Sequence, residues 1–176
     1  MTKTLIINLI GGPCSGKSTI ASGLFYNLKK LGYNCELALE FAKDKVWEES
    51  IKVLDDQFYV FGKQFHKLWR LNNKVDIIIT DSPLPISLFY NKIPSKHFNN
   101  FVVEQYKTFN NLMFFIERNP QAYEESGRLQ TKEEAEQIDE DIKNLMNLYD
   151  IKFHTLPCEI AVDEITEIIK NTWKRE

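Results

Sequence analysis

Nine consecutive residues near the N-terminus combine glycines, a lysine and hydroxyl side chains at a spacing that suits the binding of phosphate. They match the pattern G-x-x-x-x-G-K-[ST] and are Gly11, Gly12, Pro13, Cys14, Ser15, Gly16, Lys17, Ser18 and Thr19. The glycines let the backbone fold closely around an anion, and successive amides point at a β-phosphate. Lys17 then reaches the β- and γ-phosphates, and the Ser18 hydroxyl holds Mg²⁺. The motif predicts binding of ATP together with Mg²⁺.

A phosphate loop also needs a carboxylate at the end of a neighbouring strand, and Asp81 is the candidate. It directly follows the strongest apolar run of the chain, residues 75–80. Ligands of open parallel sheets bind at the carboxyl edge of the strands. Asp81 is therefore expected to serve the metal or the acceptor of a transferred group. The alternative is that it only caps the helix that follows.

Glu40 ends the second predicted strand, which has apolar residues at 37–39, and is expected to project from the same edge as Asp81. A carboxylate at this place can accept the proton of an attacking hydroxyl, or orient that hydroxyl. This chemistry is that of a kinase. The alternative is a glutamate that only begins a helix, near the positive end of its dipole.

Two arginines lie in a polar segment on the far side of the predicted site. Arg118 and Arg128 are ten residues apart, and residues 117–131 are interpreted as a lid. A lid closes over the phosphates, excludes water and supplies positive charge to the transition state. The alternative is that each arginine is exposed and paired with a nearby glutamate.

Two further charged patterns are interpreted as structural. Residues 133–141 carry six acids in nine positions, and they predict the solvated face of a helix. Residues 73–76 match the N-K-x-D pattern that reads guanine in GTPases. They precede a strand instead of following one, so they are predicted to form a turn at the opposite edge of the sheet.

The elements that must position these groups alternate between apolar strands and amphipathic helices. Strands are predicted at residues 5–10, 35–39, 75–80, 112–116 and 151–155. Helices are predicted at residues 18–31, 43–71 with a break near 55–56, 95–110, 131–149 after a capping box, and 161–173. Such alternation predicts one α/β domain over residues 1–176, with a parallel sheet covered by helices on both faces.

Composition excludes several classes of protein. The chain has 176 residues, of which 43% are hydrophobic and 27% charged, with a net charge of −3, so broad coating of nucleic acid is disfavoured. Three scattered cysteines favour a reducing compartment over a disulfide framework. No signal peptide or membrane span is expected, and the predicted location is cytoplasmic.

The order of these motifs resembles the P-loop nucleoside and nucleotide kinases. The likeness is greatest to the ribosylnicotinamide kinase domain and to small phage P-loop proteins described as ATP-binding. The residues that carry it are 11–19, 40–44, 57–64, 80–83 and 127–128. The resemblance implies a three-layer fold with a five-stranded sheet in the order 2-3-1-4-5.

The resemblance also implies roles for individual residues. Lys17 and Ser18 correspond to the residues that bind ATP and Mg²⁺, and Asp81 to one that serves the metal or the acceptor. Glu40 matches the position of the base that activates the 5′-hydroxyl in deoxynucleoside kinases, and Gln64 a position that reads the nucleobase. Four aromatic side chains either stack on a ring or belong to the core: Trp47, Phe58, Phe61 and Trp69.

The predicted function is transfer of the γ-phosphoryl group of ATP to a hydroxyl of a nucleoside-like acceptor, which is a nucleoside, ribosylnicotinamide or a nucleotide. The phage likeness suggests an alternative, in which the acceptor is a hydroxymethylated pyrimidine in modified DNA and the location is the host cytoplasm. Four residues could form a local basic patch for such DNA: Lys92, Lys96, His97 and Lys107. A further alternative is a nucleotide-dependent switch ATPase without an acceptor.

Overall fold

Five parallel strands form the centre of the molecule. The computed structural model describes residues 3–92, 95–119 and 132–173. The strands are β1 (Leu5–Ile10), β2 (Cys35–Leu37), β3 (Ile77–Thr80), β4 (Asn110–Glu117) and β5 (His154–Pro157). They are ordered β2-β3-β1-β4-β5, and every neighbouring pair is parallel. The predicted fold class and strand order are therefore confirmed.

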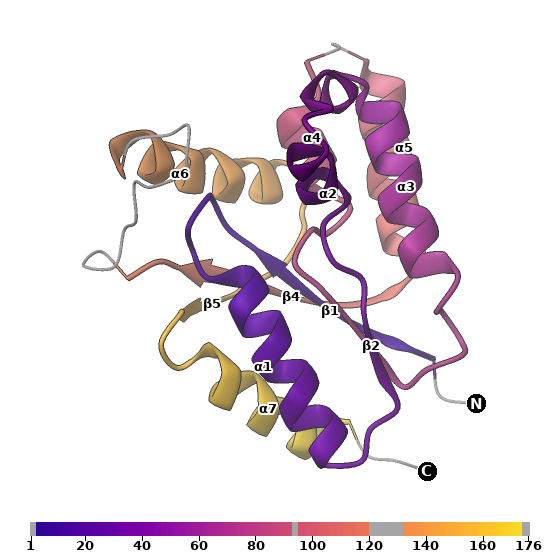
Figure 1. Cartoon of the computed structure of the whole chain (residues 1–176), viewed down its shortest axis with the longest axis vertical. Coiled ribbons are helices and arrows are strands. Elements are labelled where there is room, and N and C mark those ends of the chain that lie inside the picture. The colour runs from indigo at the N-terminus through magenta and orange to yellow at the C-terminus, as the bar shows by residue number, and fades with distance from the viewer. Residues whose placement is uncertain (1–2, 93–94, 120–131, 174–176) are drawn as a thin grey trace.

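Helices cover both faces of this sheet, which gives three layers (Figure 1). The helices are α1 (Lys17–Lys30), α2 (Phe41–Trp47), the 3₁₀ helix η1 (Ile51–Asp55), α3 (Gln57–Trp69), α4 (Ile86–Tyr90), α5 (Lys96–Lys107), α6 (Lys132–Leu148) and α7 (Ala161–Thr172). One face carries α1 and α7, and the other carries α3, α4, α5 and α6. None of the helices in the described part of the chain combines the length and apolar character needed to cross a bilayer.

The central strand β1 is buried along its whole length because helices cover it from both sides. Successive side chains of a strand point to opposite faces, so β1 serves two cores. Ile6 and Ile10 pack with residues of α3 to α6, whereas Ile7 and Leu9 pack with residues of α1 and α7. This arrangement explains why five of the six residues of β1 are apolar, rather than every second one; the exception is the buried Asn8.

The helical region after β2 is interrupted as expected, with η1 between α2 and α3. The carboxylate of Asp56 accepts a hydrogen bond from the amide of Tyr59 at 3.1 Å, which caps the start of α3. The predicted turn at residues 73–76 is also confirmed. The amide of Asn73 donates to Thr4 Oγ1 at 2.8 Å, next to the start of β1 and opposite the phosphate loop.

The last strand starts at His154, so the predicted range 151–155 is wrong at its beginning. Ile151 instead closes the turn after α6, where its amide donates to the Met146 carbonyl at 2.9 Å. Asp150 before it adopts a left-handed φ of 52°, which reverses the chain. The side chain of Ile151 is buried in the core, which accounts for its apolar type. The short helix α4 was not predicted at all.

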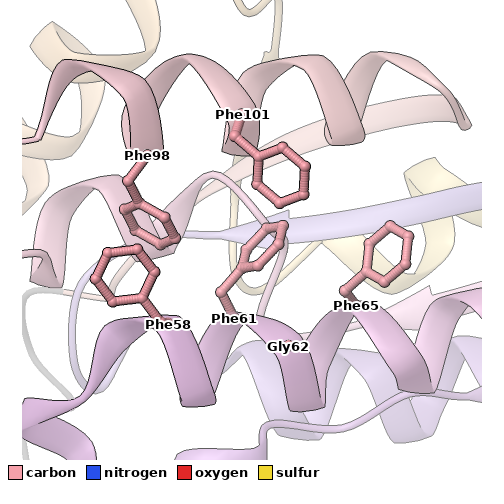
Figure 2. A pocket seen from close by; sticks show the side chains of 6 residues that line it. All are labelled: Phe58, Phe61, Gly62, Phe65, Phe98 and Phe101. Carbon is pink, nitrogen blue, oxygen red and sulfur yellow. The ribbon is translucent and has the colours of Figure 1, made fainter.

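An aromatic groove of about 440 Å³ lies between α3 and α5. Phe58, Phe61 and Phe65 reach into it from α3, and Phe98 and Phe101 face them from α5 (Figure 2). Phe61 is part of the core, whereas Phe58 and Phe101 are about half exposed. The groove offers no charged group to a phosphate, so we place the candidate active site elsewhere.

Candidate active site

The phosphate loop joins the end of β1 to the start of α1. Gly11 must be glycine, because a Cβ there would lie 2.8 Å from the Ile116 carbonyl oxygen and 2.9 Å from Ser15 Oγ. Cys14 has a left-handed φ of 66° although it carries a side chain, and Gly16 has a φ of 82°. This alternation of backbone conformation curls the chain into a concave turn ahead of the helix.

The Lys17 ammonium folds over this turn and donates to the carbonyl oxygens of Gly11 and Gly12 at 2.8 and 2.7 Å. No side chain caps the first turn of α1, and that turn holds no acid. Within the described residues, the amides of Gly16, Lys17 and Ser18 have no protein acceptor. Unpaired amides and a cation around one concave turn fit the phosphates of a nucleotide.

Burial lowers the pKa of Lys17, and three nearby carboxylates oppose this shift. They are Glu40, Asp81 and Asp139. Asp81 follows β3, whereas Asp139 pairs with Arg118 after β4, and these two strands lie on opposite sides of β1. The structure thus brings two of the predicted site residues, Glu40 and Asp81, within electrostatic reach of the predicted phosphate lysine.

Asp81 and Glu40 meet at the carboxyl edge of β2 and β3, as expected. The buried Asp81 accepts a hydrogen bond from the backbone amide of Glu40 through Oδ1 at 2.9 Å, and Glu40 is the residue before α2. Burial raises the pKa of Glu40, the charge of Asp81 raises it further, and Lys17 opposes the shift. A half-buried carboxylate with a raised pKa beside a phosphate loop is suited to accept a proton.

Gln64 of α3 is buried and holds this edge together. Its Nε2 donates to the Ala38 carbonyl at 3.1 Å and to Thr80 Oγ1 at 3.2 Å, and its Oε1 accepts from the Phe41 amide at 3.3 Å. Both amide hydrogens are therefore used inside the protein, which leaves no donor for a nucleobase. Through the Phe41 amide, Gln64 also holds the start of α2, next to Glu40. The reading of a base by Gln64 stays a prediction.

Tyr90 at the end of α4 is a neighbour of Glu40 that the sequence analysis missed. Burial raises the pKa of Tyr90, and the charge of Glu40 adds to this shift. The pattern of residues 86–90 is too short to predict a helix, so no signal placed Tyr90 at the site.

The residues predicted to hold Mg²⁺ have the right donor chemistry for a hard cation. Ser18 offers a hydroxyl in the first turn of α1, and Asp81 offers a buried carboxylate directly after β3. The described residues contain no cluster of three or more His, Cys, Asp or Glu side chains that could hold a metal alone. The site fits an ion held mainly by phosphate oxygens and water, as Mg²⁺ usually is.

On the other side of the loop, Arg118 and Asp139 form a buried ion pair. Arg118 donates to Asp139 Oδ2 through Nε at 3.0 Å and through Nη2, and Nη2 also donates to the Ala135 carbonyl at 2.8 Å. Only 6% of the Arg118 side chain and 13% of that of Asp139 are exposed. Arg118 is thus neither exposed nor paired with a glutamate. Arg128, and most of the predicted lid, lie outside the described residues.

The prediction that the acids of residues 133–141 form a solvated face is wrong for Asp139. Its side chain points into the protein and accepts the amide of Gly12 at 2.6 Å. The sequence did hold a signal, because Asp139 follows Ala135 by one turn and precedes Ile142 by three residues. Both of these residues are fully buried, so the carboxylate falls on the apolar stripe of α6.

Comparison with known proteins identifies the family. A family model described as AAA domain matches residues 6–162, which is most of the chain. The chain belongs to this family of AAA domains. No curated protein matches its sequence closely enough to count as a relative.

Among solved structures, this AAA domain is similar to the crystal structure of NadR protein in complex with NR. The TM-score is 0.62 at 13% sequence identity, and the match covers 98% of this chain. It covers 52% of the NadR chain, so this chain spans about half the length of that protein. The expected likeness to P-loop kinase-like proteins is confirmed at the level of the fold.

Proposed function

We propose that this chain is a kinase that moves the γ-phosphoryl group of ATP to a hydroxyl of a nucleoside-like acceptor. The observation that carries the proposal is the pair of carboxylates, Glu40 and Asp81, beside the phosphate lysine Lys17. A proton acceptor at this place has a use when a hydroxyl attacks the γ-phosphorus. The likeness to NadR, solved with NR, supports the choice of a nucleoside-like acceptor.

In the proposed reaction, Glu40 accepts the proton of the acceptor hydroxyl as its oxygen bonds to the γ-phosphorus. The bond from that phosphorus to the β,γ-bridging oxygen breaks, and ADP leaves with the electron pair. Lys17 balances the negative charge on the β- and γ-phosphate oxygens, and the amides of residues 16–18 hold the β-phosphate.

Mg²⁺, when bound, neutralises charge on the phosphate oxygens during this transfer. In the proposal Ser18 and Asp81 would hold the ion. Asp81 also accepts the Glu40 amide, so one residue orients both the metal and the base. Gln64 fixes the same segment through the Phe41 amide.

The test is transfer of label from γ-labelled ATP to a panel of acceptors. The panel contains nucleosides, ribosylnicotinamide, nucleoside monophosphates and hydroxymethyl-containing DNA. We expect label on a free nucleoside-like molecule. Label only on DNA would move the activity to the alternative acceptor, and ADP with free phosphate but no labelled acceptor would indicate a switch ATPase.

A matched pair of variants separates the base from the fold. Glu40→Gln keeps the size of the side chain and removes the proton acceptor, so transfer should fall while ATP binding persists. Glu36→Gln on β2 is the control, because among the described residues that carboxylate pairs with Lys29 of the last turn of α1, at 3.4 Å, and not with Lys17. Equal transfer by the two variants would contradict the role of Glu40.

A further inference from the structure

Asp139 joins three groups at one point beside the phosphate loop. Oδ1 accepts the Gly12 amide at 2.6 Å, and Oδ2 accepts the Arg118 guanidinium through Nε and Nη2. Both carboxylate oxygens therefore contact protein, which leaves Asp139 no direct role with a substrate. The amide of Gly12 lies ahead of the unpaired amides of residues 16–18, so Asp139 and a phosphate do not compete for the same donors.

The loop is also packed tightly against this carboxylate. A Cβ on Gly12 would lie 2.7 Å from Asp139 Oδ1 and 2.9 Å from Arg118 Nη2. It would also lie 3.2 Å from the Ala135 carbonyl oxygen. The guanidinium consequently lies against the backbone of the phosphate loop, and its position depends on Asp139.

One end of Arg118 has no partner. Nη1 is buried and makes no hydrogen bond with the part of the chain that the structure describes. A buried donor without an acceptor is costly, and such groups are rare in folded proteins. The charge of Arg118 also acts on Lys17 and lowers its pKa, so the two cations lie near one another. Two cations near one another beside a phosphate loop are expected to share an anionic ligand.

We propose that Asp139 is a positioning residue that holds Arg118 against the phosphate loop, so that Nη1 donates to a phosphate oxygen of the bound nucleotide. The inference rests on the proposed function, because it assumes a nucleotide in the loop. The proposal adds Asp139 of α6 to the site. The buried Arg118–Asp139 ion pair then contributes to nucleotide binding as well as to stability.

The experiment measures binding of Mg·ATP, and of tripolyphosphate as a probe without base or sugar, to the full chain. Asp139→Asn keeps Oδ1 as an acceptor for the Gly12 amide but replaces Oδ2 with an NH₂ group. Because NH₂ and the guanidinium are both donors, Arg118 loses its acceptor and is released. We expect affinity for both probes to fall about tenfold, the change expected when one charge-assisted hydrogen bond is lost. Asp141→Asn is the control, because that exposed carboxylate on α6 accepts a hydrogen bond from Gln137, and no contact with the phosphate loop is found for it in residues 3–92, 95–119 and 132–173.

The double-variant cycle with Arg118→Ala distinguishes positioning from a merely structural role. If Asp139 acts through Arg118, the two changes together should weaken tripolyphosphate binding no more than either alone. Additive losses, or a lower melting temperature with unchanged tripolyphosphate affinity, would overturn the inference. Arg118→Lys keeps a cation for Asp139 but lacks Nη1, so it tests the same point if Asp139→Asn does not fold. Unchanged affinity in Arg118→Lys would also overturn it.

These outcomes separate the inference from the proposed function. Wild-type chain that binds neither Mg·ATP nor tripolyphosphate contradicts the proposed function itself. Wild-type chain that binds both, with Asp139→Asn and Arg118→Lys binding equally well, contradicts only the inference.

Discussion

The phosphate loop has a carboxylate on each side, and each carboxylate accepts a backbone amide. Asp81 accepts the amide of Glu40, and Asp139 accepts the amide of Gly12. The two sides differ in how negative charge is balanced. Asp139 is paired directly with the buried guanidinium of Arg118. Asp81 instead lies beside a second acid, Glu40, and the nearby cation is Lys17, whose pKa is lowered by burial.

We call the side with Asp139 and Arg118 the holding side, and the side with Glu40 and Asp81 the reacting side. A carboxylate that is hydrogen-bonded to its own buried cation fixes geometry, because breaking the pair would leave a buried charge without its partner. A carboxylate near another acid in a partly buried place has a raised pKa, as Glu40 has, and can take a proton during a reaction. Variants of the two sides should therefore fail in different ways.

The largest effect is expected where both sides meet, at Lys17. Lys17→Ala removes the ammonium that faces the phosphates, so turnover should fall about a thousandfold, the upper range for one electrostatic contact. Affinity for Mg·ATP, measured by titration calorimetry, should fall as well. Tight binding of ATP by this variant would show that the loop is not the nucleotide site.

On the reacting side, Glu40→Gln should lower turnover about a hundredfold, because general base catalysis typically contributes that much or more. The variant should bind ATP as the wild type does. It should also be more stable at pH 7, since a raised folded-state pKa means that ionised Glu40 is unfavourable in the fold. Thermal unfolding at pH 7 checks this, and a lower melting temperature would contradict it.

The raised pKa of Glu40 also determines how kcat/KM depends on pH. Because the pKa of Glu40 is raised, the acidic limb of kcat/KM should lie above the pH at which an ordinary glutamate titrates. The pH profile of Glu40→Gln should lack this limb. A wild-type limb that persists unchanged in the variant would assign the proton transfer to another group.

On the holding side, Gly12→Ala should destabilise the fold by about 2 kcal/mol, because its Cβ would overlap Asp139 and Arg118. The matched change Gly62→Ala meets no atom within 4 Å. It should instead stabilise α3 by about 1 kcal/mol, the difference in helix propensity. Chemical denaturation measures the free energy of unfolding of both variants. Equal changes in the two would contradict the tight contact of Gly12 with Asp139 and Arg118.

The sequence predicted the reacting side better than the holding side. The phosphate loop, Glu40 and Asp81 are each read from a local pattern, a motif or the last residue of an apolar strand. The pairing of Gly12 with Asp139 joins residues 127 positions apart, so no local pattern contains it. The acids around Asp139 favoured the prediction of a solvated face, although the spacing of Asp139 from Ala135 and Ile142 places it on the apolar stripe of α6.

Other misses have similar physical causes. Ile151 belongs to the core through a turn and not through a strand, so its apolar type gave a misleading strand signal. For Gln64, the reading of a base stays a prediction, but its hydrogen bonds could not be foreseen, because they depend on β2 ending at Leu37 and leaving the Ala38 carbonyl for the glutamine amide. Whether a side-chain donor is already hydrogen-bonded inside the protein depends on tertiary packing. Composition and residue spacing do not reveal that packing.

The most direct test of the division between the two sides compares Mg·ATP binding by Glu40→Gln and Asp139→Asn in parallel titrations. We expect wild-type affinity for Glu40→Gln and about tenfold weaker binding for Asp139→Asn. Weakened binding by Glu40→Gln together with wild-type binding by Asp139→Asn would contradict this division.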